Sequence, residues 1–556
     1  MRRHLFALAA ALTARPIFAQ TPRPSTMAHR STVYAPHGMI ATSQPLATAA
    51  GLAVLQHGGN AVDAAVTAAA VLNVVEPQMT GIGGDMFALV WDAKHRTLVG
   101  LNASGRAGSL MTRAALLARG HTTMPQETVE DVTVPGALSG WEALLQRFGT
   151  ISLAQALQPA IGYAEEGFPV TPIIASEWAD ETQKLARDSG ARATFLVDGT
   201  RAPRAGEWFR NPDLARTFRS IQARGSGALY GGDLGRRIVE RVHELGGYLT
   251  IDDLRHHRPE WVTPISATFH GYRVWELPPN GQGLATLEML RILEPFDLRA
   301  LGHNSAAYLH LLIETKKLAY ADIAQYVGEP SAMTVTPDAL LADPFIAARR
   351  AQIDTAHAQD HPAPGKAMTA SETIYLTVAD SAGNMVSFIN SLYDLFGSGV
   401  VVPGTGFALQ DRGAGFTLEP GLANTVAPGK RPFHTIIPAF VTRADAQGVD
   451  EPWLSFGVMG GSMQPQGHVQ VLINLLVFGM DLQDAIDAPR FRHLDGLRVA
   501  LEPAIGDAVR RQLTALGHVI VPDSDIAFGG AQAILRLPRG YAGGSDPRKD
   551  GMAAGH

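Results

Sequence analysis

The sequence predicts a protein of the α+β class, with helices and strands packed around a large core. Its 556 residues are 46% apolar and 18% charged, which is enough to bury a core of that size. Helical and strand-like patterns alternate along the chain after a polar leader, and a clear strand pair begins near residue 373. Layered sandwiches of helices and sheets exceed the usual domain length, so length alone does not fix the number of domains.

The first half of the chain contains well-defined helical and strand patterns. Residues 51–76 predict a helical region, because small and apolar side chains recur at three- and four-residue spacings. The turn Gly58-Gly59-Asn60 interrupts it. A glycine-rich turn at 81–85 leads into a predicted strand at 86–91. Residues 311–320 predict another helix.

The amino-acid composition changes in the second half of the chain. Residues 354–372 are rich in Ala, His, Pro, Asp, Ser and Thr, a composition typical of an exposed, mobile connector. Residues 373–380 and 385–389 then predict two strands of a hairpin joined by a short turn. Beyond the hairpin we expect glycine-punctuated β structure as far as about Phe456, followed by a helix near 466–478.

The N-terminus has the order of a secretory signal peptide. Arg2 and Arg3 precede the apolar run Leu5–Ala14, and small residues allow a cut after Ala19. Residues 1–19 are therefore predicted to be removed, which implies a periplasmic or secreted protein. Because Arg15 and Pro16 interrupt the run, a cytoplasmic protein with an unstructured start is the alternative. No apolar stretch is long enough to predict a membrane span.

Composition and missing motifs exclude several classes of function. The formal net charge is −6 with no basic block, so nucleic acid is not an expected partner. The absence of cysteine removes thiol nucleophiles and disulfides. The 19 histidines form no recognisable metal motif, and the glycine turns lack the lysine of a phosphate loop. We expect no metal and no organic cofactor.

The remaining chemical candidate is Thr373, which opens a strand directly after the connector. A threonine hydroxyl is a weak nucleophile unless a base lies beside it. When threonine is N-terminal, its own α-amine, with a pKa of about 8, can be that base. Taken alone the pattern is weak, because threonine opens many strands.

The motifs around Thr373 and in the first half of the chain occur together in one order. They are Gly58–Ala65, Glu76-Pro77, Gly81–Gly84, Val134–Gly136, Pro278–Gly281, Thr373–Asp380, Gly383-Asn384, Phe396–Gly406, Pro428–Pro432, Gly460–Ser462 and Gly544–Arg548. From about Ala35 to Arg548, the chain resembles the γ-glutamyltranspeptidase family of N-terminal-nucleophile hydrolases.

The resemblance implies a fold and a maturation step. The fold is the four-layer αββα sandwich of N-terminal-nucleophile hydrolases. The precursor would cut itself into a large subunit, residues 20–372, and a small catalytic subunit, residues 373–556, with 354–372 as the flexible connector before the cut. The oligomeric state stays open, a homo-oligomer of such heterodimers included.

The resemblance also implies four catalytic residues. Thr373 matches the N-terminal nucleophile, and Ser391 matches a second hydroxyl that hydrogen-bonds to it. Gly460 and Gly461 match the two amides of the oxyanion hole. Adjacent glycines leave their N–H groups accessible to a developing oxyanion, in agreement with that role.

Several positions that would recognise glutamate depart from the family pattern. Tyr375 replaces a histidine, Ser104 replaces an arginine that recurs two residues later as Arg106, and Gly415 replaces the acid that would bind the α-ammonium group. The predicted substrate-binding residues are Arg106, Tyr393, Arg412, His434 and Thr435. Arg106 and Arg412 favour an anionic acyl group, as in a branch that includes glutaryl acylases. Structural ion pairs, and a packed role for His434, remain open alternatives.

The sequence therefore predicts a self-processing N-terminal-threonine amidohydrolase or acyltransferase. The first expectation for its substrate is a γ-glutamyl amide of the glutathione type, with transfer to water favoured over transfer to an amine acceptor. One alternative is an acylase for glutaryl or other dicarboxylyl amides. A second alternative, of another class, is an inactive binding scaffold that never matures, which the departure at Tyr375 keeps open.

Overall fold

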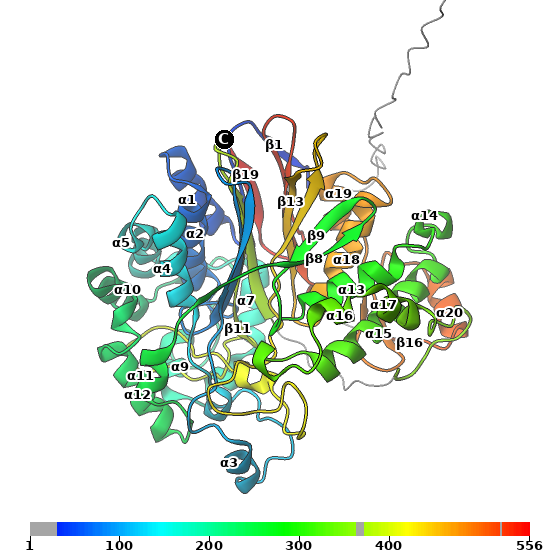
Figure 1. Ribbon diagram of the computed structural model, residues 1–556. Helices are drawn as coiled ribbons and strands as arrows, with labels where there is room; N and C mark the ends of the chain where they lie inside the picture. The colour runs from blue at the N-terminus through cyan, green and yellow to red at the C-terminus, as the bar shows by residue number, and fades with distance from the viewer. Residues whose placement is uncertain (1–29, 363–371, 523–524) are drawn as a thin grey trace, which may run out of the picture.

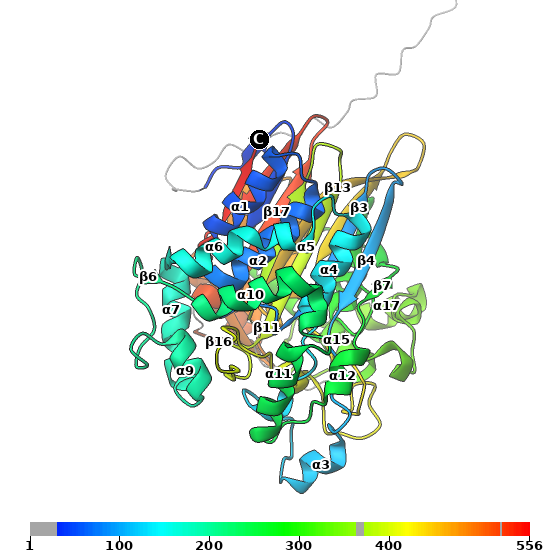
Figure 2. The ribbon, with the colours of Figure 1, turned by 90° about the vertical axis from the view of Figure 1, so that its left-hand side faces the viewer.

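Two sheets face each other in the centre of the molecule, and helices cover both outer faces (Figures 1 and 2). The computed structural model describes residues 30–362, 372–522 and 525–556. The arrangement confirms the predicted four-layer αββα sandwich. The predicted signal peptide and residues 363–371 of the predicted connector lie outside the described residues, so both stay predictions.

The first sheet contains the strand that begins at the predicted nucleophile. Its strands, all antiparallel, run in the order β19 (Met552–Gly555), β2 (Met39–Thr42), β10 (Glu372–Ala379), β11 (Met385–Tyr393), β3 (Asp85–Asp92), β4 (Thr97–Ala103) and β7 (Glu260–Val262). Helices α1 (Pro45–Gln56), α2 (Ala61–Val75) and α4 (Ala137–Phe148) cover its outer face (Figure 1).

The second sheet is also antiparallel throughout. Its strands run in the order β1 (Val33–Ala35), β18 (Tyr541–Ser545), β17 (Gly530–Arg536), β13 (Asp450–Met459), β12 (Ala439–Ala444), β9 (Tyr272–Glu276) and β8 (Ile265–Phe269). Its outer face carries α13 (Gly283–Leu293), α18 (Met463–Leu476) and α19 (Leu482–Asp487), and α15 (Ala306–Tyr326) packs on α13.

Shorter elements surround this sandwich. They are α3 (Arg113–Ala118), η1 (Val129–Asp131), α5 (Leu153–Ala156), α6 (Gln158–Glu166), β5 (Phe168–Pro169), α7 (Pro172–Asp180), α8 (Thr182–Leu185), α9 (Ser189–Phe195), β6 (Trp208–Phe209), α10 (Pro212–Arg224), η2 (Gly225–Ala228), α11 (Asp233–Glu244), α12 (Ile251–His256), α14 (Leu298–Leu301), η3 (Pro330–Ala332), α16 (Pro337–Leu340), α17 (Asp343–Arg350), η4 (Arg412–Gly415), β14 (Phe491–His493), β15 (Arg498–Leu501), α20 (Asp507–Ala515), β16 (Val519–Val521) and η5 (Asp525–Phe528).

Three apolar layers separate the four layers of secondary structure, and β10 contributes to two of them. Ile374, Leu376 and Val378 pack against the helices that cover the first sheet. Tyr375 points the other way, into the layer between the two sheets. Because side chains alternate along a strand, Thr373 belongs to the same face as Tyr375 and points toward the second sheet.

The main predicted elements of the first half are confirmed. The helical region 51–76 lies within α1 and α2, and Asn60 caps α2 by accepting hydrogen bonds from the N–H groups of Val62 and Asp63. The polar, turn-forming side chain at this position explains why one helix ends and another begins there. The predicted strand 86–91 is β3.

The hairpin is confirmed as β10 and β11, but the expected β structure beyond it is only partly present. Residues 394–438, all of them described, contain no strand and only isolated bridges and η4. The expectation was wrong for this segment because many of its glycines adopt positive φ, which breaks an extended chain. They are Gly397, Gly399, Gly404, Gly406, Gly421 and Gly429.

None of the helices in the described part of the chain combines the length and the apolar character needed to cross a bilayer.

The carboxyl group of Glu76 is buried at the end of α2. Its Oε2 accepts a hydrogen bond of 2.5 Å from Ser43 Oγ, and burial raises its pKa to about 8. The folded protein therefore keeps a proton that the unfolded chain, with a pKa of about 4.3, has released. The stabilising contribution is complete below that unfolded pKa and is lost as pH rises to about 8, by up to about 1.4 kcal/mol per pH unit.

We expect Glu76→Gln to become progressively more stable than the wild type as pH rises. Glutamine preserves the contact with Ser43 but does not titrate, so the difference in thermal midpoint should grow from about pH 5 to pH 8. Glu244→Gln, at the exposed end of α11, is the control and should give a constant difference. A pH-independent difference for Glu76→Gln would contradict the prediction.

Candidate active site

Thr373 lies in an irregularity at the start of β10. The register between β10 and β11 shifts between Glu372 and Ile374, which is the signature of a β-bulge. The extra residue lies in β11, between Asn390 and Tyr393, and the fully buried Thr373 Oγ1 donates a hydrogen bond of 3.1 Å to Ser391 Oγ. The structure thus brings together the predicted nucleophile and its predicted helper hydroxyl.

Ser391, near the end of β11, is a point of convergence. Its Oγ also accepts a hydrogen bond from the Tyr393 backbone N–H (2.9 Å) and one from Arg412 Nη2 (3.0 Å). Tyr393 has φ of 88°, a conformation that is costly for a residue with a large side chain. In this conformation, the Tyr393 N–H donates to Ser391 Oγ, the same oxygen that accepts the hydrogen bond from Thr373.

Arg412 begins the single-turn helix η4 and is fully buried. Its Nη1 donates to Thr435 Oγ1 at 2.8 Å, and its guanidinium lies 4.3 Å from the centre of the Tyr393 ring. No carboxylate of a described residue forms an ion pair with this guanidinium, and its Nε has no hydrogen-bond partner there. Burial lowers the pKa of Arg412. A buried cation held only by hydroxyls and an aromatic ring lacks its counter-ion.

Asp85 is a site residue to which the sequence analysis assigned no role. It pairs with Ser391 in the register of β3 and β11. Burial raises its pKa to about 6 although the charge of Arg412 opposes the shift. Its Oδ1 accepts hydrogen bonds from two backbone N–H groups and the Gln410 side chain, and its Oδ2 is 3.1 Å from His434 Nε2. In the sequence, its position directly after the glycine turn 81–84 is the one feature that could have indicated a role in the site.

His434 is a packed, hydrogen-bonded histidine. Its Nδ1 accepts a hydrogen bond from the Ile436 N–H, so its Nε2 carries the proton and donates to Asp85. Burial and the nearby guanidinium of Arg412 lower its pKa well below the usual value. Its ring also lies against Phe87, with 4.8 Å between ring centres. Both nitrogens are occupied, which supports the structural alternative for this residue.

Two more carboxyl groups lie beside the Arg412 backbone. The Asp394 N–H donates to Asp411 Oδ1 at 3.1 Å, and both side chains are largely buried. Burial and the mutual repulsion of the two carboxyls raise the pKa of Asp394 to about 10. A proton is therefore retained on this pair at neutral pH.

The predicted oxyanion glycines form the turn between β13 and α18. Gly460 has φ of 117° and Gly461 has φ of 53°, values that glycine adopts without strain. Among the described residues, neither N–H donates a hydrogen bond, whereas the Gly460 carbonyl accepts one from the Met463 N–H at 2.8 Å. Two successive unpaired amides are the arrangement required to bind an oxyanion.

Contacts between the facing sheets relate this turn to Thr373. Thr377 Oγ1 and Ser455 Oγ are 2.7 Å apart, and the Tyr375 ring lies against Gly457, where a Cβ would come within 2.5 Å of it. A step of two residues along β10 toward Thr373 thus moves the contact two residues along β13 toward Gly460. By the same step, we expect Thr373 to lie opposite Met459, the residue before the glycine turn.

Tyr375 has a structural explanation. Its ring fills the space left by Gly457 between the sheets, and its hydroxyl is 2.7 Å from Ser387 Oγ. A buried hydroxyl needs such a partner. The departure from the family pattern therefore contributes to the core, without contacting the Thr373 hydroxyl.

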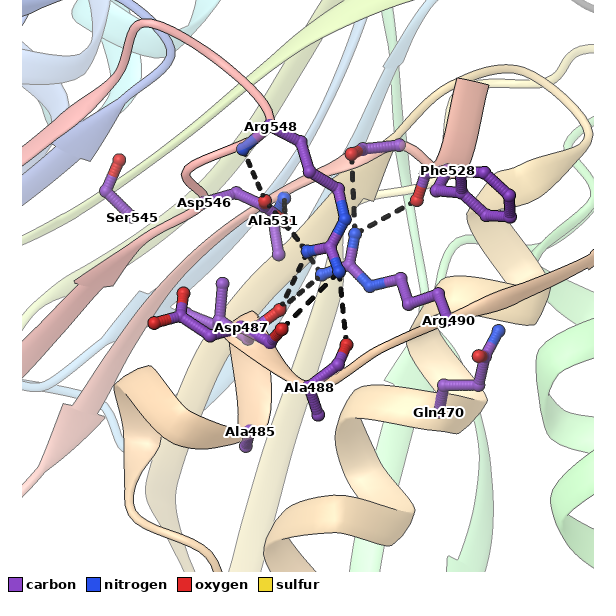
Figure 3. A network of polar contacts seen from close by, with 12 residues as sticks. Gln470, Ala485, Asp487, Ala488, Arg490, Phe528, Ala531, Ser545, Asp546 and Arg548 are labelled. Atoms are coloured by element: carbon purple, nitrogen blue, oxygen red, sulfur yellow. Dashed lines mark hydrogen bonds and ion pairs between the residues drawn. The ribbon is translucent and has the colours of Figure 1, made fainter. Parts of the chain in front are cut away.

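A buried network of two arginines and an aspartate supports the far side of the glycine turn (Figure 3). Arg490 Nη1 donates to the carbonyls of Phe528 and Gly529, and its Nη2 is 2.7 Å from Asp546 Oδ2. The Gly529 backbone in turn packs against Gly460, because a Cβ on Gly460 would lie 3.1 Å from Gly529 Cα. Arg548, which also contacts Asp546, completes the network. The C-terminal motif 544–548 thus has a structural role behind the turn.

Arg106 occupies a different environment from Arg412. Its side chain is 35% exposed and forms ion pairs with Glu260 (2.9 Å) and Glu329 (3.2 Å). Buried Arg431 contacts the same two carboxylates. The charge of Arg106 is therefore already balanced, as the ion-pair alternative for this residue expected.

One buried cluster has the residue types of a metal site. His310, Glu314 and His518 lie within 4.8 Å of one another. His310 Nδ1 is 2.8 Å from His518 Nε2, a hydrogen-bond distance, and Lys317 Nζ is 2.8 Å from Glu314 Oε1. The ammonium group of Lys317 thus supplies the positive charge beside Glu314. It also donates a hydrogen bond to the Gln359 carbonyl.

Comparison with known proteins places these features in a family. A model of the family described as Gamma-glutamyltranspeptidase matches residues 47–556. Similar proteins include the glutathione hydrolase-like YwrD proenzyme of Bacillus subtilis (37% identical, over 93% of this chain and 98% of the relative) and the oxamate amidohydrolase proenzyme of Klebsiella pneumoniae (36%, over 94% and 98%). The crystal structure of cephalosporin acylase from Bacillus halodurans superposes with a TM-score of 0.90 at 45% identity, covering 96% of this chain and 99% of that one.

The chain belongs to the γ-glutamyltranspeptidase family and is an enzyme of the N-terminal-nucleophile type, an amidohydrolase or acyltransferase.

Proposed function

We propose that the chain is a precursor that cuts itself between Glu372 and Thr373, and that Thr373 is then the nucleophile for amide hydrolysis. The hydrogen bond from its hydroxyl to Ser391 supports this role. Similar proteins are named proenzymes, which is consistent with a precursor. The products would be residues 20–372 and 373–556, exported if the predicted signal peptide functions. Whether these heterodimers assemble further stays open.

The proposed mechanism uses groups of the protein alone. The freed α-amine of Thr373, with an ordinary pKa of about 8, takes the proton from Oγ1 as that oxygen attacks the amide carbonyl. The amides of Gly460 and Gly461 bind the oxyanion. The α-ammonium group then gives its proton to the leaving nitrogen, so collapse of the tetrahedral intermediate releases the amine and leaves an ester on Thr373. Water, activated by the same α-amine, hydrolyses this ester to the free acid and restores the Thr373 hydroxyl.

The environment of Arg412 is the basis for our proposal about the chemical nature of the acyl group. Its guanidinium is fully buried and has no ion pair among the described residues, and one hydroxyl, that of Ser391, separates it from the nucleophile. A carboxylate on the acyl group would supply the missing counter-ion and form a strong, bidentate pair. We therefore propose that the substrates are amides of dicarboxylic acids, glutaryl amides among them.

A free α-ammonium group on the acyl chain has no comparable partner. At Gly415, the position expected to hold its acid, a Cβ would lie 2.5 Å from the Phe433 carbonyl oxygen, so the backbone leaves no room for a side chain. Asp85 accepts protein hydrogen bonds at both oxygens. Hydrolysis of γ-glutamyl amides stays the second candidate, favoured by the 37% identity to a glutathione hydrolase-like protein.

We expect Thr373→Ala to abolish both maturation and hydrolysis. Without the hydroxyl, the bond before residue 373 has no internal nucleophile, and a denaturing gel should show one uncut chain. Thr377→Val is the matched control: it lies on the same strand and is equally buried, but it contacts Ser455, so this variant should be cut normally. Cleavage that persists in Thr373→Ala, or an uncut wild type, would contradict the proposal and favour the inactive scaffold.

We expect Arg412→Gln to lower kcat/KM for a glutaryl anilide by about a hundredfold or more, because the acyl carboxylate loses its buried partner. The neutral pentanoyl anilide has the same chain length and should lose much less. The ratio of the two rates separates carboxylate binding from any damage to Ser391.

Arg106→Gln distinguishes the two arginines, since its ion pairs predict an unchanged ratio. A ratio that collapses in Arg106→Gln and survives in Arg412→Gln would assign the carboxylate to Arg106. A wild type that prefers the γ-glutamyl anilide to the glutaryl anilide would favour the second candidate.

A further inference from the structure

We infer that Gln282 is a positioning residue, which fixes the Gly460–Gly461 turn relative to the segment that holds Arg412. The inference rests on the proposed function, in which that turn binds the oxyanion and Arg412 binds the acyl carboxylate. Gln282 lies before the proposed cut and contacts neither the nucleophile nor Arg412. Its effect would therefore pass through the backbone of the turn.

The side-chain amide of Gln282 bridges two carbonyl groups. Its Nε2 donates to the carbonyl oxygen of Gly461 at 2.8 Å and to that of Thr435 at 2.6 Å. Its backbone N–H donates to the His434 carbonyl at 3.0 Å, which places the residue against the 434–435 segment. The side chain is completely buried.

The chemistry of the position explains why an amide is present. Two carbonyl acceptors need two N–H donors on one nitrogen, which a glutamine side chain provides. Its Oε1, by contrast, is buried without a hydrogen-bond partner among the described residues. An unpaired buried acceptor is destabilising, so the two hydrogen bonds that Nε2 donates come at a cost in stability.

The bridge connects the two ends of the proposed acyl site. Thr435 Oγ1 accepts a hydrogen bond from Arg412, and the Thr435 carbonyl is held by Gln282. The same nitrogen holds the Gly461 carbonyl, directly after one of the oxyanion amides. One side chain therefore links the anchor for the acyl carboxylate to the site of the developing oxyanion, beside a second link from the Ile437 N–H to Gln464 Oε1.

Gln282→Met tests this role, because methionine is similar in size and has no donor. The oxyanion forms fully only in the transition state, so a displaced turn lowers kcat with little effect on KM. For the glutaryl anilide, with rates normalised to the cut chain, we expect kcat to fall by about tenfold to a hundredfold and KM to change by less than about threefold.

Gln470→Met is the matched control. Gln470 is also buried, and its Nε2 bridges the carbonyls of Gln466 and Phe491 without touching the turn. Because Gln470 Oε1 also accepts a hydrogen bond from the Phe491 N–H, this variant should lower thermal stability at least as much as Gln282→Met and leave kcat unchanged. Equal losses of kcat in the two variants, or kcat of Gln282→Met within twofold of the wild type, would overturn the inference.

A second pair of variants gives a readout that packing alone would not change. In Gln282→Glu, an ionised carboxylate repels both carbonyls, whereas the protonated form can donate to one of them. Its activity relative to the wild type should therefore recover as pH falls, while Gln470→Glu should show a constant ratio. A constant ratio for Gln282→Glu would contradict the role.

The outcomes separate this inference from the proposed function. If Thr373→Ala is inactive and Gln282→Met behaves like Gln470→Met, only the role of Gln282 is wrong. If Thr373→Ala is active, the nucleophile is misassigned and the inference falls with it. If Gln282→Met folds with the stability of Gln470→Met but alone stays uncut, a disturbed oxyanion turn is supported by the cutting reaction itself.

Discussion

The hydrogen bond from Thr373 Oγ1 to Ser391 Oγ is the contact on which the rest of the site depends. It joins the second residue of β10 to the end of β11, and the pairing of these two strands sets its geometry. The bulge between Asn390 and Tyr393 of β11 and the strained backbone of Tyr393 occur at the same end of this strand pair. Local strain of this kind persists only where surrounding packing fixes it, and here the two sheets and α2 do so.

Burial of a charge without a partner is the second constraint. Folding places Arg412 in the interior, where an uncompensated guanidinium is unfavourable. Asp85, Asp394 and Asp411 reduce that cost through space, but none of them pairs with it directly. An anionic group that reached this guanidinium would supply the direct ion pair that the protein does not.

Local patterns predicted the hairpin and the helix break, whereas the four-layer fold and the roles of the Thr373 and Ser391 hydroxyls were predicted from the family resemblance. The alternation along 373–380 and the turn after it determine the hairpin, and Asn60 with its neighbouring glycines determines the break between α1 and α2. The roles of Asp85 and Gln282 could not be predicted in this way. Asp85 contacts His434, and Gln282 contacts Gly461, only after segments far apart in the sequence pack together. Arg106 and Arg412 look alike in sequence, and only the distribution of carboxylates in space distinguishes them.

Residues from both sides of the proposed cut contribute to the site. Asp85 and Gln282 precede residue 373, whereas Ser391, Arg412 and the glycine turn follow it. Cleavage therefore leaves an active site only if the two chains stay packed. Two contacts distant from Thr373 favour this: Lys549 Nζ lies 2.6 Å from Glu177 Oε1 in the interior, and the partly buried Asp550 accepts hydrogen bonds from the first turn of α7. Neither contact involves the residues at the proposed cut, so both would persist after cleavage and, with the apolar layers between the sheets, would keep the two chains packed.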